Sequence, residues 1–316
     1  MSPAEKALAR ILFQREIYRR DGQAFEDFFS RIMEYHNSNF NQIKPQGPIG
    51  DRKNDGYDRT TGTYHQVYAP EDVKETVSTA VTKARKDFTG MKAFWEALCP
   101  IRSYRFVYND KYQGVYPTIE AELAAIKRDH NLEECGTLAA KDLEDIALNL
   151  TDDKIIAVIG FVPDPTHIQQ VRFSVLDEVI RHVMSQQSPV TPGQIFSAPN
   201  FEEKIKFNGL SKVTGALLAT GSFQRGAVDE YFSLNSAWAR QSLRDTFSQG
   251  YASALAAIPD GQLEPPARGD LIFFEILQQA LPPEATKAHQ DAALVLMAYY
   301  FESCDIFEDP GINKRS

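Results

Sequence analysis

The pattern of hydrophobic residues changes near Leu150, and this change constrains the fold more than any other feature of the chain. Before Leu150, short stretches rich in aromatic and β-branched residues are interspersed with helical patterns. After it, prolines separate long amphipathic stretches. The sequence therefore predicts an α/β domain at residues 1–150, with a small mixed sheet flanked by helices, and a mainly helical domain at residues 151–316.

The composition is that of a globular protein, with 43% hydrophobic and 24% charged residues among 316. The longest apolar run, Ala292 to Phe301, is about half the length that a membrane span requires. The first twenty residues are too charged for a secretory signal. Cys99, Cys135 and Cys304 lack partners at metal-ligand spacing, which predicts reduced thiols. We expect a soluble cytoplasmic protein without a membrane span.

Charge is distributed unevenly between the two halves. Residues 1–150 hold 21 Lys and Arg against 23 Asp and Glu, whereas residues 151–316 hold 13 against 20. A protein that binds nucleic acid through its phosphates alone normally has a basic domain. We therefore expect any nucleic-acid contact to come from a local patch, and the acidic second half to meet a partner protein.

Within the first half, apolar spacing predicts a core helix at residues 23–36. The segment Arg59 to Gly62 (RTTG) predicts a hairpin turn between arms at residues 53–57 and 63–68. Further helices are predicted at residues 71–86 and 118–130, with a strand at residues 104–109. In the second half, helices are predicted at residues 169–186, 201–218, 224–251, 272–281 and 284–302.

The densest polar run in a strand context extends from Gly47 to Tyr57, and Gln66 follows on the second arm. Asp51 and Asp55 lie in this run, where carboxylates beside a polar residue of the next arm can form a Mg²⁺ pocket. Turn and capping chemistry is the alternative role for both acids, since Asp beside glycine often satisfies local backbone N–H groups. Gln66 can equally be an ordinary sheet residue.

Strand alternation predicts which side chains of the second arm point together. Tyr64, Gln66 and Tyr68 fall on one face, and His65 falls on the other. His65 is therefore a packed or exposed histidine rather than a catalytic base. The aromatic strand at residues 104–109 is expected to pack in the core. The basic run Lys83 to Lys86 is read as a helix C-terminus, and it is also the best basic patch of this half.

Residues 10–145 resemble the restriction-endonuclease-like, PD-(D/E)XK nuclease fold of the Mrr type. The resemblance rests on a helix carrying Phe25-Glu26, then Gly50-Asp51-x-x-x-Asp55-Gly56, then Gln66-x-Tyr68. It implies that Asp55 and Gln66 bind a metal, Mg²⁺ or Mn²⁺, with Asp51 and Glu26 close to it.

Tyr68 falls where that nuclease family places a lysine, and this departure leaves two functions open. A neutral phenol cannot supply the positive charge that orients the attacking water at pH 7. Either Lys53 supplies it from the adjacent arm, or the site is inactive and the chain is an adaptor or sensor scaffold. In the active case Asp55, Gln66, Lys53 and Tyr68 form the catalytic set of a metal-dependent endonuclease that cleaves DNA, with RNA as the alternative substrate.

The second half resembles the C-terminal domains of ABC three-component bacterial conflict systems. The matching segments are Phe201 to Ser211, Val228 to Phe232, and Leu243 to Asp245 leading to Tyr251. This resemblance implies an effector subunit of an anti-phage defence system, coupled to an ABC-type ATPase and a small middle subunit. Self-association into a homo-oligomer is left open.

The absence of other motifs excludes several classes of enzyme. The sequence contains no GxxxxGK[ST], GxSxG or HExxH motif and no dinucleotide-binding glycine pattern. The chain is therefore not expected to hydrolyse ATP through a Walker motif, nor to act as a serine hydrolase, a zinc peptidase or a dehydrogenase.

Overall fold

The computed structural model describes residues 1–186, 201–234, 237–258, 268–303 and 306–308. The chain forms two compact units. Glu16–Gly160 form one unit, here called the sheet unit, and Met1–Arg15 join Phe161–Ser316 in the other, here called the helical unit. The predicted boundary at residue 150 falls within the sheet unit, and the first fifteen residues cluster with the helical unit.

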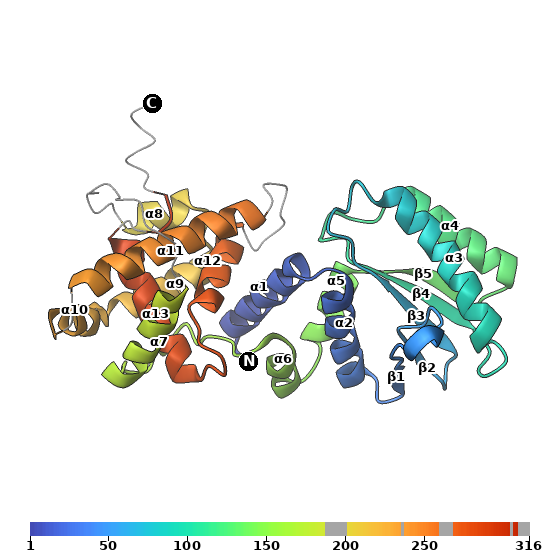
Figure 1. Cartoon of the computed structure of the whole chain (residues 1–316), viewed down its shortest axis with the longest axis horizontal. Coiled ribbons are helices and arrows are strands. Elements are labelled where there is room, and N and C mark those ends of the chain that lie inside the picture. Colours follow the sequence, from blue (N-terminus) through green and yellow to red (C-terminus); the bar gives the residue numbers. More distant parts are fainter. Residues whose placement is uncertain (187–200, 235–236, 259–267, 304–305, 309–316) are drawn as a thin grey trace, which may run out of the picture. The chain divides into compact units, whose positions relative to one another are not determined.

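The sheet unit contains a mixed five-stranded sheet of order β1-β2-β3-β4-β5 (Figure 1). The strands are β1 (Phe40–Gln42), β2 (Gly56–Asp58), β3 (Thr63–Tyr68), β4 (Ser103–Tyr108) and β5 (Glu134–Ala139). β1, β2 and β3 pair antiparallel, whereas β3, β4 and β5 pair parallel through helical crossovers. The predicted small mixed sheet is confirmed. β5 was not predicted, because its sequence ECGTLA has little strand character of its own.

The predicted hairpin between β2 and β3 is confirmed. Asp58 Oδ1 accepts hydrogen bonds from the backbone N–H groups of Thr60 and Thr61, which closes the turn. Gly62 has a φ of +68°, and a Cβ there would lie 2.7 Å from the carbonyl oxygen of Pro100. Glycine is therefore required where the turn meets the following chain.

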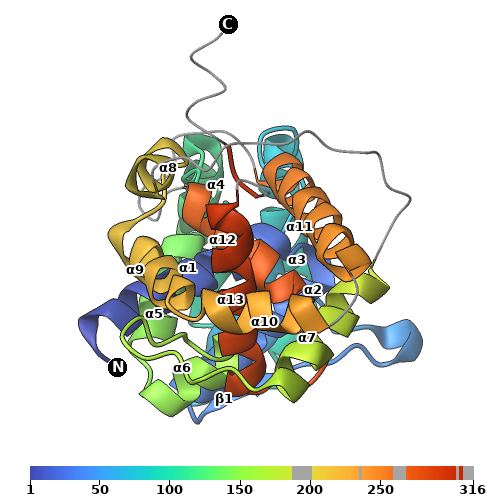
Figure 2. The same cartoon turned by 90° about the vertical axis from the view of Figure 1, so that its left-hand side faces the viewer.

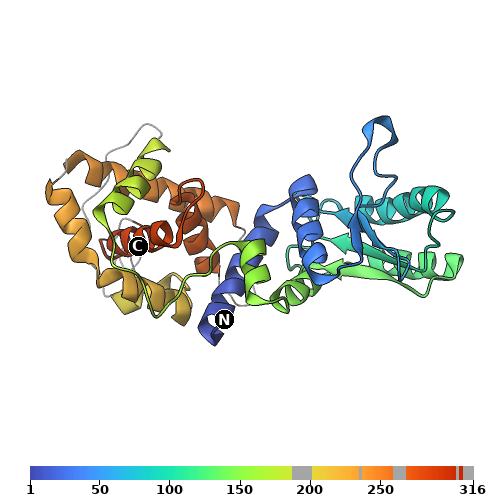
Figure 3. The same cartoon turned by 90° about the horizontal axis from the view of Figure 1, so that it is seen from below.

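Helices cover both faces of the sheet (Figures 1 and 3). One face packs on α3 (Val77–Trp95) and α4 (Pro117–His130), and the other on α2 (Gly22–His36) and α5 (Ala140–Leu148). Tyr104, Phe106 and Tyr108 are fully buried on the α3 face, so the prediction that this strand packs in the core is confirmed. The short helix α6 (Asp152–Ile159) follows α5 in this unit.

α3 begins and ends later than the predicted helix at residues 71–86. The carboxylate of Asp72 accepts hydrogen bonds from the N–H groups of Lys74 and Glu75, and this local turn delays the helix to Val77. The helix continues to Trp95 because Phe88 and Met91 are buried under the sheet. Lys83 therefore lies in the middle of α3 and not at its C-terminus.

The helical unit is built around α13 (Lys287–Glu302), as Figure 2 shows. Twelve consecutive residues of this helix, Gln290 to Phe301, are buried, because α7, α9, α10 and α12 surround it. The other described helices of the unit are α1 (Pro3–Arg19), α7 (Phe173–Ser185), α8 (Phe201–Phe207), α9 (Lys212–Ser222), α10 (Arg225–Leu234), α11 (Ala237–Ala257) and α12 (Arg268–Gln279). The last residues of α1, from Glu16 on, belong to the sheet unit. The predicted mainly helical second half is confirmed.

The helix predicted at residues 201–218 is interrupted and forms α8 and α9. Gly209 adopts a φ of +62°, which ends α8, and the Ser211 side chain caps α9 by accepting a hydrogen bond from the N–H of Thr214. The stretch at residues 224–251 likewise forms α10 and α11. In the described ranges, no helix has both the length and the apolar composition to cross a membrane.

Candidate active site

The β2–β3 hairpin brings Asp55 and Gln66 together on one face of the sheet. The N–H of Asp55 donates to the carbonyl of His65, which places Asp55 opposite Gln66. Gln66 Nε2 then donates to Asp55 Oδ2 over 2.8 Å, and the N–H of Val67 donates to the same oxygen over 2.5 Å. Both side chains are buried, at 2% and 4% exposure. The two residues that the sequence places on separate arms thus meet.

Strand alternation around this pair is also confirmed. Tyr64 stacks on Tyr57 at 5.0 Å between ring centroids, and Tyr68 stacks on Phe106, all on the α3 side of the sheet. His65 points to the other side and contacts Phe29 and Phe40. Burial lowers the pKa of His65 to about 4, so its ring is neutral near pH 7.

One acceptor atom of the pair is unused. Gln66 Oε1 is buried and has no hydrogen-bond partner among the residues that the structure describes. A buried carbonyl oxygen without a donor costs about 1 to 3 kcal/mol. This oxygen, Gln66 Oε1, belongs to the side chain whose Nε2 contacts Asp55. The other carboxylate oxygen of Asp55, Oδ1, accepts no hydrogen bond from the described residues. The chemistry of these oxygens fits a hard divalent cation.

The charge around Asp55 also fits a cation. The pKa of Asp55 is raised to about 7, mainly by burial and also by the negative charges of Glu26 and Asp51, against the lowering effects of the Val67 N–H and Lys83. Burial likewise raises the pKa of Glu26, with a contribution from Asp51. The negative charges of Glu26, on α2, and of Asp51, in the turn before β2, thus both act on Asp55.

Asp51 itself is engaged in a local turn. Its Oδ1 accepts a hydrogen bond from the N–H of Lys53 over 2.7 Å. This bond is the turn role that the sequence offers as the alternative to metal binding for Asp51. Arg52 and Lys53 have φ values of 56° and 67°, a left-handed conformation that costs non-glycine residues roughly 1–2 kcal/mol each. The turn before the candidate site therefore stores backbone strain.

Two lysines lie beside the pair and share one acid. Asp87, 2% exposed on α3, forms ion pairs with Lys83 at 2.5 Å and with Lys53 at 3.3 Å. Lys83 Nζ also lies 5.9 Å from the centre of the Tyr68 ring. Lys83 thus brings a positive charge from α3 close to Tyr68, the residue that the resemblance to PD-(D/E)XK nucleases places where those enzymes have a lysine.

Sequence analysis does not predict this position of Lys83, because a basic run of this kind is typical of a helix C-terminus. The spacing of Lys83 and Asp87, four residues apart in a helix that follows β3 directly, is the signal that could have found it. The structure does not gather all four predicted metal ligands into one cluster. Across the described ranges, no group of three or more His, Cys, Asp and Glu side chains is placed to hold a metal ion.

Comparison with known proteins identifies the second half of the chain. Residues 174–308 match the family model of C-terminal domain 10 of the ABC-three component (ABC-3C) systems, so the chain carries this domain. The match begins in α7 and includes α8 to α13, whereas Met1–Arg15 of the same unit lie outside it; it confirms the resemblance found in the second half of the sequence. No curated protein and no solved structure matches the chain. The resemblance of the first half to PD-(D/E)XK nucleases has no support from these comparisons.

Proposed function

We propose that the chain is the effector subunit of a bacterial ABC-3C anti-phage defence system, and that its sheet unit is a metal-dependent nuclease. One observation carries this proposal: Asp55 and Gln66 meet on the sheet with an unpartnered buried Gln66 Oε1 and a raised Asp55 pKa. The chain that holds this pair also carries an ABC-3C C-terminal domain. An ABC-type ATPase and a small middle subunit would control the nuclease through the helical unit.

In this proposal Asp55 and Gln66 hold Mg²⁺ or Mn²⁺ through their side-chain oxygens, and Glu26 contributes from α2. A divalent cation at such a site stabilises charge on the phosphate and lowers the pKa of bound water. Two hydrogen bonds, donated by Gln66 Nε2 and by the N–H of Val67, fix the orientation of the Asp55 carboxylate. A carboxylate fixed in this way needs no reorganisation when the substrate binds.

Lys83 takes the role that Tyr68 cannot perform. Its ammonium group holds a positive charge beside the site, and Asp87 keeps it in place. Lys53 shares Asp87 and is 48% exposed, which suits contact with a substrate phosphate. The proposed division of roles is therefore a lysine near the attacking water, Lys83, and a lysine that binds the backbone of the substrate, Lys53.

The test is phosphodiester cleavage by the purified full chain with Mg²⁺ or Mn²⁺, alone and together with the proteins encoded beside it. Asp55→Asn keeps the size of the side chain but removes its charge, and it should lower cleavage at least about a hundredfold. Asp129→Asn, at an exposed acid on α4, is the matched control and should cleave like the wild type. Full activity of Asp55→Asn would refute the site.

A second candidate function is a catalytically inactive adaptor within the same kind of complex. Tyr68 favours it, because this residue stacks on Phe106 and Tyr108 as a core side chain does and carries no positive charge. Phage protection in cells discriminates between the two functions. If cells that carry Asp55→Asn resist phage as well as the wild type, the adaptor is correct; loss of protection with normal protein levels favours the nuclease.

A further inference from the structure

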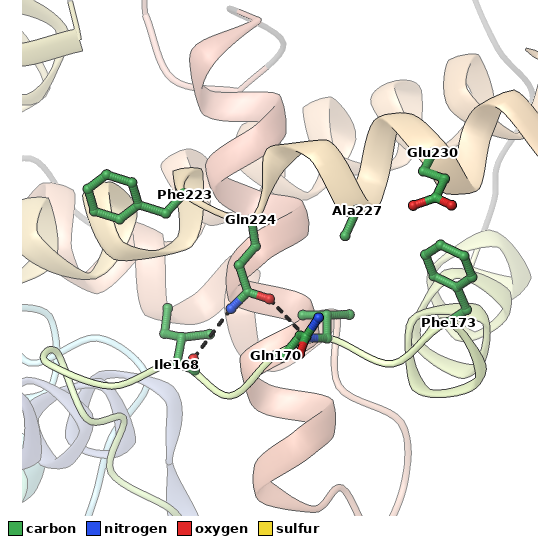
Figure 4. Close-up of a pocket in the computed structure, with 8 residues that line it drawn as sticks. Ile168, Gln170, Phe173, Phe223, Gln224, Ala227 and Glu230 are labelled. Carbon is green, nitrogen blue, oxygen red and sulfur yellow. Dashed lines mark hydrogen bonds between the residues drawn. The ribbon is translucent and has the colours of Figure 1, made fainter.

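The helical unit contains a groove between the segment that precedes α7 and the start of α10. Its volume is about 650 Å³. Side chains from both segments line it (Figure 4), namely Ile168, Gln170, Phe173, Phe223, Ala227 and Glu230. This surface lies far in sequence from the Asp55 site and takes no part in the chemistry proposed there.

Hydrogen bonds fix the shape of the groove. Gln224 Nε2 donates to the carbonyl oxygen of Ile168, and Gln224 Oε1 accepts from the N–H of Val171 (Figure 4). Gln224 Nε2 also donates to the carbonyl oxygen of Gln169. One side chain thus holds an extended segment of four residues against α10. A groove whose walls are already held in place loses little conformational entropy when it binds a partner.

The groove exposes apolar surface that soluble proteins normally cover. Phe223 is 88% exposed and Phe173 is 39% exposed, and they lie at opposite ends of the groove (Figure 4). Phe173 makes an edge-to-face contact with Tyr231. Exposed apolar patches mark interaction surfaces, and phenylalanine is among the residues enriched in the buried core of protein interfaces.

The charge in the groove is negative. Glu230 lies near Phe173, and its carboxylate forms neither an ion pair nor a hydrogen bond with the residues that the structure describes. It lies three residues after Ala227, on the same side of α10. The half of the chain from residue 151 onward is also acidic overall, with 13 basic against 20 acidic residues.

We propose that this groove is the docking site for a segment of a partner protein that presents an apolar side chain next to a lysine or arginine. The apolar side chain fills the hollow and covers Phe223, and the cation pairs with Glu230. A nucleic acid is repelled by the acidic surface, and a small molecule inside the hollow leaves Phe223 at its end uncovered. This inference rests on the proposed function, because it specifies where an ABC-3C partner binds.

The experiment measures the affinity of the purified full chain for the ATPase and the small middle protein encoded beside it. Phe223→Ala and Glu230→Lys should each weaken the binding of one of these proteins at least about tenfold. Phe207→Ala and Glu203→Lys, at exposed positions of α8 outside the groove, are the matched controls and should bind like the wild type. Circular dichroism and thermal unfolding establish that the variants fold.

Three results would overturn the docking site. Both groove variants could bind as tightly as the wild type, which would leave the proposed nuclease function untouched. The wild type could form dimers and the Phe223→Ala variant remain monomeric, in which case the groove binds a second copy of this chain. Finally, the wild type could bind neither protein, which would also refute control of the nuclease by these partners. The proposed cleavage by the sheet unit would still be tested separately, by the activity of the Asp55→Asn variant.

Discussion

Lys83 and Asp55 approach the same place from different elements, and their neighbours decide what each can do. Asp55 is buried with two donors on one oxygen, so its charge needs a cation nearby. Lys83 is paired with Asp87 and lies over the Tyr68 ring, so it is held close to the site. In the proposed nuclease, the charge of Lys83 would replace that of the lysine that the nuclease family has at the position of Tyr68.

Substitution of Lys83 separates the two lysines. If Lys83 assists the attacking water, Lys83→Ala should lower the cleavage rate about a hundredfold or more with little change in substrate affinity, because the charge acts in the transition state. Lys53→Ala should mainly weaken substrate binding. The measurement is the dependence of the cleavage rate on substrate concentration. Equal effects of both variants on affinity alone would contradict these roles.

His65 makes the stability of the protein depend on pH. Its pKa is lowered to about 4 by burial, from about 6.5 in the unfolded chain. The folded state binds this proton more weakly, so the stabilising contribution is present above pH 6.5 and is lost as the pH falls towards 4. We expect the free energy of unfolding of the sheet unit to fall by about 2 to 3 kcal/mol over this range on account of His65 alone.

The check is chemical denaturation of the full chain at several pH values, followed by circular dichroism. His65→Phe keeps an aromatic ring against Phe29 and Phe40 and should lose this part of the pH dependence. His36→Phe, at the exposed end of α2, should keep it. The same pH dependence in wild type and His65→Phe would show that another group is responsible.

Elements in this protein are positioned as much by close backbone contacts as by side chains. The first turn of α12 approaches the chain between α8 and α9 so closely that a Cβ on Gly269 would lie 2.1 Å from the carbonyl oxygen of Asn208. The same junction is held by Asp270, which accepts a hydrogen bond from the N–H of Ser211. Lys204 of α8 in turn donates to the carbonyl of Phe301, in the last turn of α13, and to that of Ile306, which follows the helix.

Two glycine substitutions test this contact. Gly269→Ala should destabilise the helical unit by about 1 to 3 kcal/mol, because the backbone of α12 must move away from Asn208. Gly226→Ala, in the first turn of α10, meets no atom within 4 Å and should be neutral or stabilise by up to about 1 kcal/mol. Urea denaturation of both variants provides the comparison, and equal stability of the two would contradict the close approach.

The whole molecule has a net charge of −9, which restricts how it can bind nucleic acid. The positive charge near the candidate site comes from Lys53 and Lys83, with Lys86 one turn further along α3. Binding through so few phosphate contacts is weak and depends only moderately on salt. In the proposed function, the ATPase and the small middle subunit would supply the remaining affinity for the substrate.

Salt dependence measures this directly. With about three phosphate contacts, the logarithm of the association constant for duplex DNA should fall with the logarithm of the salt concentration with a slope of about −3. Fluorescence anisotropy with Ca²⁺ in place of Mg²⁺ gives this slope for the full chain. A slope steeper than about −5 would require a larger basic surface than these lysines provide.

The sequence by itself determined the features that depend on neighbouring residues. The hairpin turn, the alternation that puts Gln66 and Tyr68 on one face, and most helices follow from patterns with a period of two or 3.6 residues. The meeting of Asp55 and Gln66 also follows, because a hairpin fixes the register of its two arms. Residues 174–308 could be assigned to a family for the same reason, since its pattern is carried in one continuous segment.

Only the tertiary structure decided the features that depend on distant residues. β5 is a strand because β4 offers it a partner, and Lys83 comes next to Tyr68 because α3 packs across the sheet. Residues 1–15 cluster with the helical unit although they precede the sheet in sequence. The free energy that stabilises these features comes from strand pairing and apolar burial between segments far apart in the sequence. The residues of one segment alone therefore do not predict them.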